Sequence, residues 1–213
     1  MKTLRMTSSR LLSLLVLTAC AAPEDAPAPP EAYDITPEAA PTDTEISRVS
    51  AVAAPVAGAL TQTLGGNLMA AIEADGHVGA MEFCNVQAMP LTAQVTEEQG
   101  LEVKRTSWRV RNPDNAPDSL EVQALAHFAA QAEAGEAPEP WVQAVPAGGW
   151  RYYQPLPTGD LCLSCHGSPE QLGDGVQQAL DRLYPDDEAT EFNAGELRGL
   201  LRVSVPDEAV SGG

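Results

Sequence analysis

The sequence predicts one α+β domain, in which an antiparallel β-sheet is flanked by helices and a long helix stands at the N-terminal end. Two patterns support this fold class. Apolar residues recur every three or four positions from Ile46, as on one face of a helix. After Gly100, several strand patterns follow one another without the regular strand–helix alternation of a parallel sheet. The length of 213 residues, 44% of them hydrophobic, suffices for one core and is short for two.

The chain is strongly acidic. It contains 12 Lys and Arg against 30 Asp and Glu, for a formal net charge of −18. Nucleic acid is therefore excluded as a partner, because binding it requires a basic face that displaces counterions from phosphates. A polybasic membrane-surface protein is excluded for a similar reason.

The first 45 residues carry the features of export and tethering. Residues 1–19 combine basic residues, an apolar stretch and a small residue just before Cys20, as in a lipoprotein signal peptide. We expect Cys20 to be lipidated and to anchor the protein on the periplasmic side of a bacterial membrane, with Ala21 favouring the outer membrane. An ordinary signal peptide is the alternative. Residues 20–45 are rich in Ala, Pro and acids, which predicts a disordered tether.

The folded domain is predicted to span residues 46–207, followed by a short tail at 208–213. Its helical pattern runs from Ile46 to Ile72, and a second helix is expected from about Val78 to Val95. Pro55 should bend the first helix, and Pro90 should break or kink the second.

The rest of the domain is predicted to be mostly β-structure. The expected elements are a strand at 101–110, a turn at 112–115, a helix capped by Asp118 and running to Gln131, and a hairpin with strands at 141–145 and 150–155. A last strand at 197–205 alternates apolar with mainly polar residues, which predicts one buried face.

The sharpest motif of the sequence is Cys162-Leu163-Ser164-Cys165-His166. Two thiols three positions apart and an adjacent imidazole suit the covalent attachment of one c-type haem, with His166 as an axial ligand of the iron. A structural zinc site and a thiol redox pair are the alternatives. Zinc would require a fourth ligand, and a thioredoxin-like pair would follow a strand of a βαβ unit, which the sequence does not predict.

Cys84 is left without a partner once the other cysteines are assigned. A free thiol is a liability in an oxidising compartment. It is either a small buried apolar residue of a helix or the sixth ligand of the iron, opposite His166. Further candidates for that position are His77, His127, Met69, Met81 and Met89.

Several segments together resemble a known family. They are residues 80–88 (AMEFCNVQA), 105–117 (RTSWRVRNPDNAP), 151–155 (RYYQP), 162–167 (CLSCHG) and 184–199. In this order and spacing they resemble the haem-c-binding PAS-like domain family, long catalogued as a periplasmic domain of unknown function. The resemblance covers about residues 46–206.

The resemblance implies an antiparallel PAS-like sheet of about five strands beside a covalent haem, with His166 and Cys84 as axial ligands. Arg111 is a candidate partner for a haem propionate, because a guanidinium matches a carboxylate; a purely structural turn is the alternative. Tyr152 is a candidate for the haem edge, and a half-buried hairpin strand explains it equally well.

Two functions fit such a haem. The first is a redox or diatomic-gas sensor, in which Cys84 leaves the iron on reduction. The second is an electron-transfer carrier whose acidic surface docks on a basic partner. An enzyme of the peroxidase type is disfavoured, because it needs an open axial position. Many relatives carry a membrane helix and a signalling module. This chain ends soon after the last strand, so we expect a sensor of this kind to act through another, unidentified protein.

Overall fold

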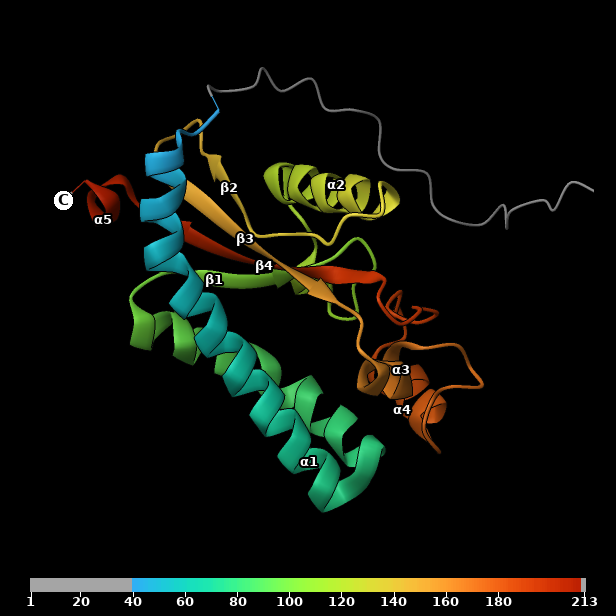
Figure 1. The fold of residues 1–213 in the computed structure, drawn as a ribbon. Coiled ribbons are helices and arrows are strands. Elements are labelled where there is room, and N and C mark those ends of the chain that lie inside the picture. Colours follow the sequence, from blue (N-terminus) through green and yellow to red (C-terminus); the bar gives the residue numbers. More distant parts are fainter. Residues whose placement is uncertain (1–39, 212–213) are drawn as a thin grey trace, which may run out of the picture. The chain divides into compact units, whose positions relative to one another are not determined.

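The computed structural model describes residues 40–211. The predicted signal peptide, Cys20 and most of the predicted tether lie outside the described residues. The elements, labelled in Figure 1, are α1 (Asp43–Gln99), β1 (Val103–Thr106), η1 (Pro113–Asn115), α2 (Ser119–Glu133), β2 (Trp141–Ala144), β3 (Trp150–Pro157), α3 (Asp160–His166), α4 (Val176–Leu183), β4 (Leu197–Val205) and α5 (Asp207–Val210). None of the helices in these residues is long and apolar enough to cross a membrane.

Helix α1 begins at Asp43, slightly before the expected start of the domain at Ile46. Thr42 caps it through a capping box, in which the Thr42 hydroxyl accepts from the Glu45 N–H and the Glu45 carboxylate accepts from the Thr42 N–H. This cap explains why the last residues of the predicted tether are helical.

Helix α1 is a hairpin of two arms. Its backbone leaves the helical conformation at Gly76, where φ is 67°, and the chain then doubles back (Figure 1). We call residues 43–75 the first arm and residues 77–99 the second arm. The two predicted helices are therefore present, with the turn between them at a residue that tolerates positive φ. Pro90 lies inside the second arm without ending it.

The sheet has four antiparallel strands in the order β1-β4-β3-β2. The predicted hairpin is present as β2 and β3, and the last predicted strand is β4. This confirms the α+β class with an antiparallel sheet and a long N-terminal helix. The resemblance implied about five strands; residues 40–211 form four, because the chain before β1 is helical up to Gln99.

The central strand β4 is buried on both faces, so the prediction of one buried face was wrong. Leu201 and Val203 pack against the first arm of α1, whereas Leu200 packs against α2 on the opposite face of the sheet. A central strand loses its exposed face when each side of the sheet carries a helix.

Helix α2 closes its face of the sheet. Asp118 caps it as predicted, and Leu125 and Phe128 form a cluster with Tyr153 of β3. At the edge of this cluster lies Glu121, which is 0% exposed. Its carboxylate accepts from Arg202 at 2.9 Å and from Lys104 at 2.7 Å.

Helices α3 and α4 form a separate cluster with the second arm of α1. Met81 is buried there against Val176, Ala179 and Leu180 of α4, and Cys165 packs at its edge. This cluster brings the segment with the cysteine motif next to the second arm, on which Cys84 lies.

Candidate functional site

The cysteine motif forms the short helix α3, which follows β3. Cys162, Cys165 and His166 all lie within it, between Gly159 and Gly167. Both cysteines are free of disulfides and half-buried, as is Cys84. The thiols and the imidazole are therefore presented together by one rigid turn of helix.

His166 is held by a backbone carbonyl. Its Nδ1 lies 2.6 Å from the carbonyl oxygen of Ala189, and because that oxygen can only accept, Nδ1 is the donor. The other nitrogen, Nε2, then carries no proton and has a lone pair. Burial lowers the pKa of His166 well below its usual range, and Arg198 and Arg111 lower it further. His166 is thus a neutral imidazole in the tautomer that suits a metal ligand at Nε2.

A backbone clasp joins α3 to residues 187–192. The N–H of Glu191 donates to the Gly167 carbonyl, and the N–H of Phe192 donates to the His166 carbonyl, both at 2.9 Å. The ring of Phe192 stands edge-on to the imidazole, with 6.3 Å between ring centroids. These contacts, together with the Ala189 carbonyl, fix the orientation of the histidine.

Arg111 connects α3 to residues 187–192 through side-chain hydrogen bonds. Its Nη2 donates to the carbonyl oxygens of Cys165 at 2.6 Å and Ala189 at 3.1 Å, and its Nε donates to the Asp187 carboxylate. Both side chains of the Arg111–Asp187 pair are largely buried. The sequence made Arg111 a candidate partner for a haem propionate. In this structure its donors are engaged within the fold, so we assign it to holding the motif segment.

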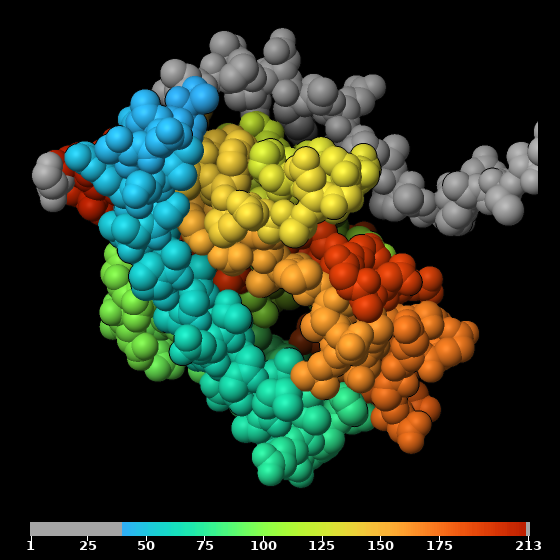
Figure 2. Space-filling view, viewed as in Figure 1, coloured from blue at the N-terminus to red at the C-terminus, as the bar shows by residue number. Residues whose placement is uncertain are grey.

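A cavity of about 130 Å³ lies between the two arms of α1 and the end of the sheet. It is lined by Leu64, Gly65, Leu68, Phe83, Cys84, Ala88, Leu91 and Arg105. Figure 2 shows a hollow between α1, in teal, and the segment around the motif, in orange; no residue of that segment lines the cavity. Burial raises the pKa of the Cys84 thiol, an effect that Arg105 and Arg111 oppose.

Arg105 is the polar member of this cavity wall and was not singled out from the sequence. It lies on β1, and its buried Nε has no hydrogen-bond partner among residues 40–211. Burial lowers the pKa of Arg105. A signal was present in the sequence: in a chain with 12 basic residues, Arg105, Arg109 and Arg111 occur within one short stretch.

Cys84 is the one proposed sixth ligand that lines this cavity. Met81 is buried against α4, with its sulfur 3.5 Å from Arg111 Nη1, and Met69 and Met89 are exposed. His77 lies against Gly173 in the α3–α4 connection. His127 is on α2, where it stacks on Trp141 at 4.5 Å.

Tyr152 belongs to the sheet core. It is 2% exposed in the cluster under the first arm, and its hydroxyl donates to Gln154 at 2.9 Å. It is not among the residues that line the cavity.

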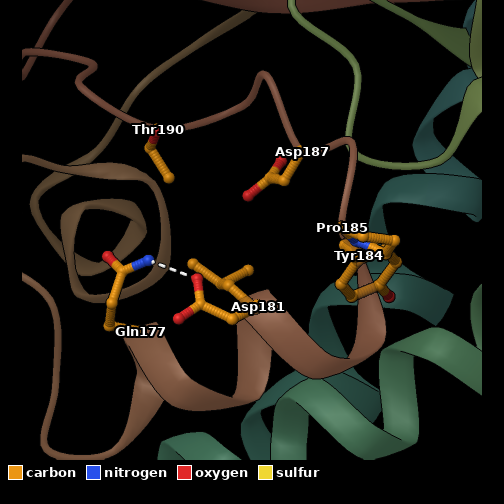
Figure 3. Close-up of a pocket in the computed structure, with 7 residues that line it drawn as sticks. Gln177, Asp181, Tyr184, Pro185, Asp187 and Thr190 are labelled. Atoms are coloured by element: carbon orange, nitrogen blue, oxygen red, sulfur yellow. Dashed lines mark hydrogen bonds between the residues drawn. The ribbon is translucent and has the colours of Figure 1, made fainter.

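A second cavity, of about 240 Å³, lies on the outer side of α4 (Figure 3). Its wall carries the carboxylates of Asp181 and Asp187 and does not include Cys84; residues of the motif line neither cavity. We regard the smaller cavity as the functional one, because it contains a thiol and an uncompensated guanidinium. For the zinc alternative there is no supporting geometry, since the part of the chain that the structure describes has no group of three or more His, Cys, Asp or Glu placed to hold a metal.

Comparisons with known proteins give one family and one solved structure. The model of the Tll0287-like family matches residues 31–206. The crystal structure of the cyanobacterial heme-protein Tll0287 is similar in fold, with a TM-score of 0.53 and 21% sequence identity over 78% of this chain and 97% of that chain. Among curated proteins, none matches this chain.

Proposed function

Because this chain belongs to the Tll0287-like family, as its motifs led us to expect, we propose that it binds one haem covalently through Cys162 and Cys165. The fold is that of a solved heme protein, Tll0287. The observation that carries the proposal is the bond from His166 Nδ1 to the Ala189 carbonyl, which leaves Nε2 available as an axial ligand.

The residues at the site fit such a group. Two half-buried thiols and a neutral imidazole lie on α3, and the cavity beside the second arm supplies a third thiol, an apolar wall and a cation. We propose Cys84 as the sixth ligand. The cavity is smaller than the about 300–1,000 Å³ of typical ligand clefts, and its lining includes no residue of the motif, so we assign to it only part of the surroundings of the haem.

The proposed role is a redox or diatomic-gas sensor. The haem supplies one-electron chemistry and an iron site for a small ligand. His166 is fixed by the clasp, whereas Cys84 stands on the second arm, which is joined to the first arm by the turn at Gly76. Cys84 would hold the iron in the oxidised protein and would be released in the reduced one. The second arm would then be free to change position, which would be the signal read by a protein partner.

An electron-transfer carrier is the second candidate. The net charge of −18 favours it, because an acidic surface steers association with a basic redox partner. In this role both ligands stay on the iron, and the second arm does not move. Both candidates need no substrate turnover, so we propose that the protein is not an enzyme.

We further propose that the protein is anchored through a lipid on Cys20 and faces the periplasm. This supports either role, since c-type haem is attached in that compartment.

The test begins with a pyridine haemochrome assay on protein made with active c-type haem maturation. We expect a covalent c-type spectrum that is lost when Cys162 and Cys165 are both replaced by Ala; a haem-free wild-type protein would contradict the proposal.

Reduced protein is then exposed to CO. Uptake of CO with loss of the thiolate spectrum supports the sensor, and an unchanged spectrum supports the carrier. Cys84→Ala should alter the ferric spectrum, with the exposed Met89→Ala as its control.

A further inference from the structure

Arg105 is half-buried and forms no ion pair within residues 40–211. Its Nε is out of contact with solvent and has no hydrogen-bond partner among these residues. A buried donor without an acceptor costs about 1–3 kcal/mol. A bound group that accepts from this nitrogen would remove that cost.

The lack of a carboxylate partner for Arg105 within residues 40–211 is not explained by a shortage of Asp and Glu. The chain has 30 Asp and Glu, and other arginines of the same sheet obtain carboxylates. Arg202 pairs with both Glu102 and Glu121, and Arg151 pairs with Asp118. The cavity wall around Arg105 is otherwise apolar apart from Cys84. The position thus excludes the chain's own carboxylates.

Cys84 does not satisfy Arg105 either. Both residues line the same cavity, yet the Nε of Arg105 makes no hydrogen bond to the Cys84 sulfur. A guanidinium presents its donors as a planar fork, which matches a carboxylate better than a single sulfur atom. The cavity therefore offers a carboxylate site beside a candidate iron ligand.

We propose that Arg105 binds a carboxylate of the haem, one of its two propionate groups, inside this cavity. The inference rests on the proposed haem and specifies how the haem is oriented. The carboxylate compensates the charge of Arg105, and Arg105 keeps that carboxylate ionised in an apolar surrounding. Loss of Arg105 would leave an uncompensated negative charge close to the iron, which disfavours the reduced form.

The test is the reduction potential of the purified, haem-loaded full chain. Arg105→Gln should shift the ferric–ferrous equilibrium about tenfold towards the ferric form, a fall of about 59 mV for one electron. Arg48→Gln, at an exposed arginine of the first arm, is the matched control and should leave the potential nearly unchanged. An unchanged potential in Arg105→Gln would overturn the inference.

Measuring the same pair in a Cys84→Ala background separates the two anions that could face Arg105. The shift persists there if the partner is a propionate, and it disappears if the partner is the thiolate, which would overturn the inference. Arg105→Lys keeps the charge and loses the fork, so the propionate bands in resonance Raman spectra should shift; unshifted bands would also overturn it. A wild-type protein without haem would instead refute the proposed function.

Discussion

The arginines on the two faces of the sheet differ in whether they have a carboxylate partner. Arg202 on β4 is directed to the α2 face, where Glu121 and Glu102 neutralise it. Arg105 lies on β1 beside it in the ladder, since Lys104 pairs with Arg202 and Arg105 with Leu201. It belongs to the α1 face and has no such partner.

One face thus pairs its arginine with carboxylates, whereas the other carries a buried guanidinium nitrogen that has no partner among residues 40–211. Under α2, an aromatic cluster packs beside Glu121, whose carboxylate accepts from Arg202 and Lys104. Under α1, the first arm covers the sheet as far as Leu60, and beyond it Leu64 and Leu68 border the cavity instead. The larger apolar cluster lies under α1, on the same face as the candidate site, whereas the α2 face carries the Glu121 network.

The largest effect is expected from a substitution of Glu121, on the α2 face of the sheet. Glu121→Gln removes the charge shared by Arg202 and Lys104 and leaves Arg202 with Glu102 as its remaining carboxylate partner, so the free energy of unfolding should fall by about 2–3 kcal/mol. Urea unfolding measures this. Glu133→Gln, at an exposed position of the same helix, is the control. A loss below about 1 kcal/mol would mean that the network contributes little.

Arg111→Gln tests the clasp on the motif side. It removes the bonds to Asp187 and to the carbonyls of Cys165 and Ala189, so we expect a loss of about 2–3 kcal/mol in urea unfolding. Because the Ala189 carbonyl also accepts from His166, the iron–histidine stretching band should shift as well. Arg182→Gln breaks an exposed pair with Glu82 and should cost at most about 1 kcal/mol. Equal effects of the two variants would refute the role of Arg111.

A third variant tests the turn at Gly76, between the two arms of α1. Gly76→Ala places a side chain at φ 67°, so we expect a loss of about 1–2 kcal/mol, although nothing lies within 4 Å of the added methyl group. Gly58→Ala is the matched control inside the first arm, where the added methyl also meets nothing and should stabilise by up to about 1 kcal/mol. Thermal unfolding of both variants gives the comparison; a neutral Gly76→Ala would argue against a turn fixed by this residue.

The smallest effect is expected at Glu102, the exposed partner of Arg202. Arg202 lowers the pKa of Glu102 through hydrogen bonds that outweigh the opposing effect of burial. A lowered folded-state pKa contributes stability above the unfolded pKa of about 4.3, which is lost as the pH falls through the folded value. Since the Glu102 side chain is 62% exposed, Glu102→Gln should cost only about 0.2–1 kcal/mol at pH 7 and nothing in strong acid. A cost that grows as the pH falls would contradict this sign.

Local signals predicted much of the fold. The cap at Asp118, the β2–β3 hairpin and the bounds of β4 depend on neighbouring residues, and the structure has them as predicted. Burial of Leu200 could not be predicted, because it depends on α2 crossing the far face of the sheet. The proposed ligands followed from thiols and imidazoles, whereas Arg105 and the Ala189 carbonyl are defined by tertiary contacts alone.

The place of β4 in the sheet sets the order in which the chain can fold. β4 is the last strand in the described part of the chain and one of the two inner strands of the sheet, where it joins β1 to β3. Synthesis proceeds from the N-terminus, so α3 with its two cysteines emerges before the strand that completes the sheet. Pairing between β1 and β4 spans nearly a hundred residues, and such long-range pairing slows folding. There is therefore an interval in which Cys162 and Cys165 have been synthesised but β4 has not yet paired with β1 and β3.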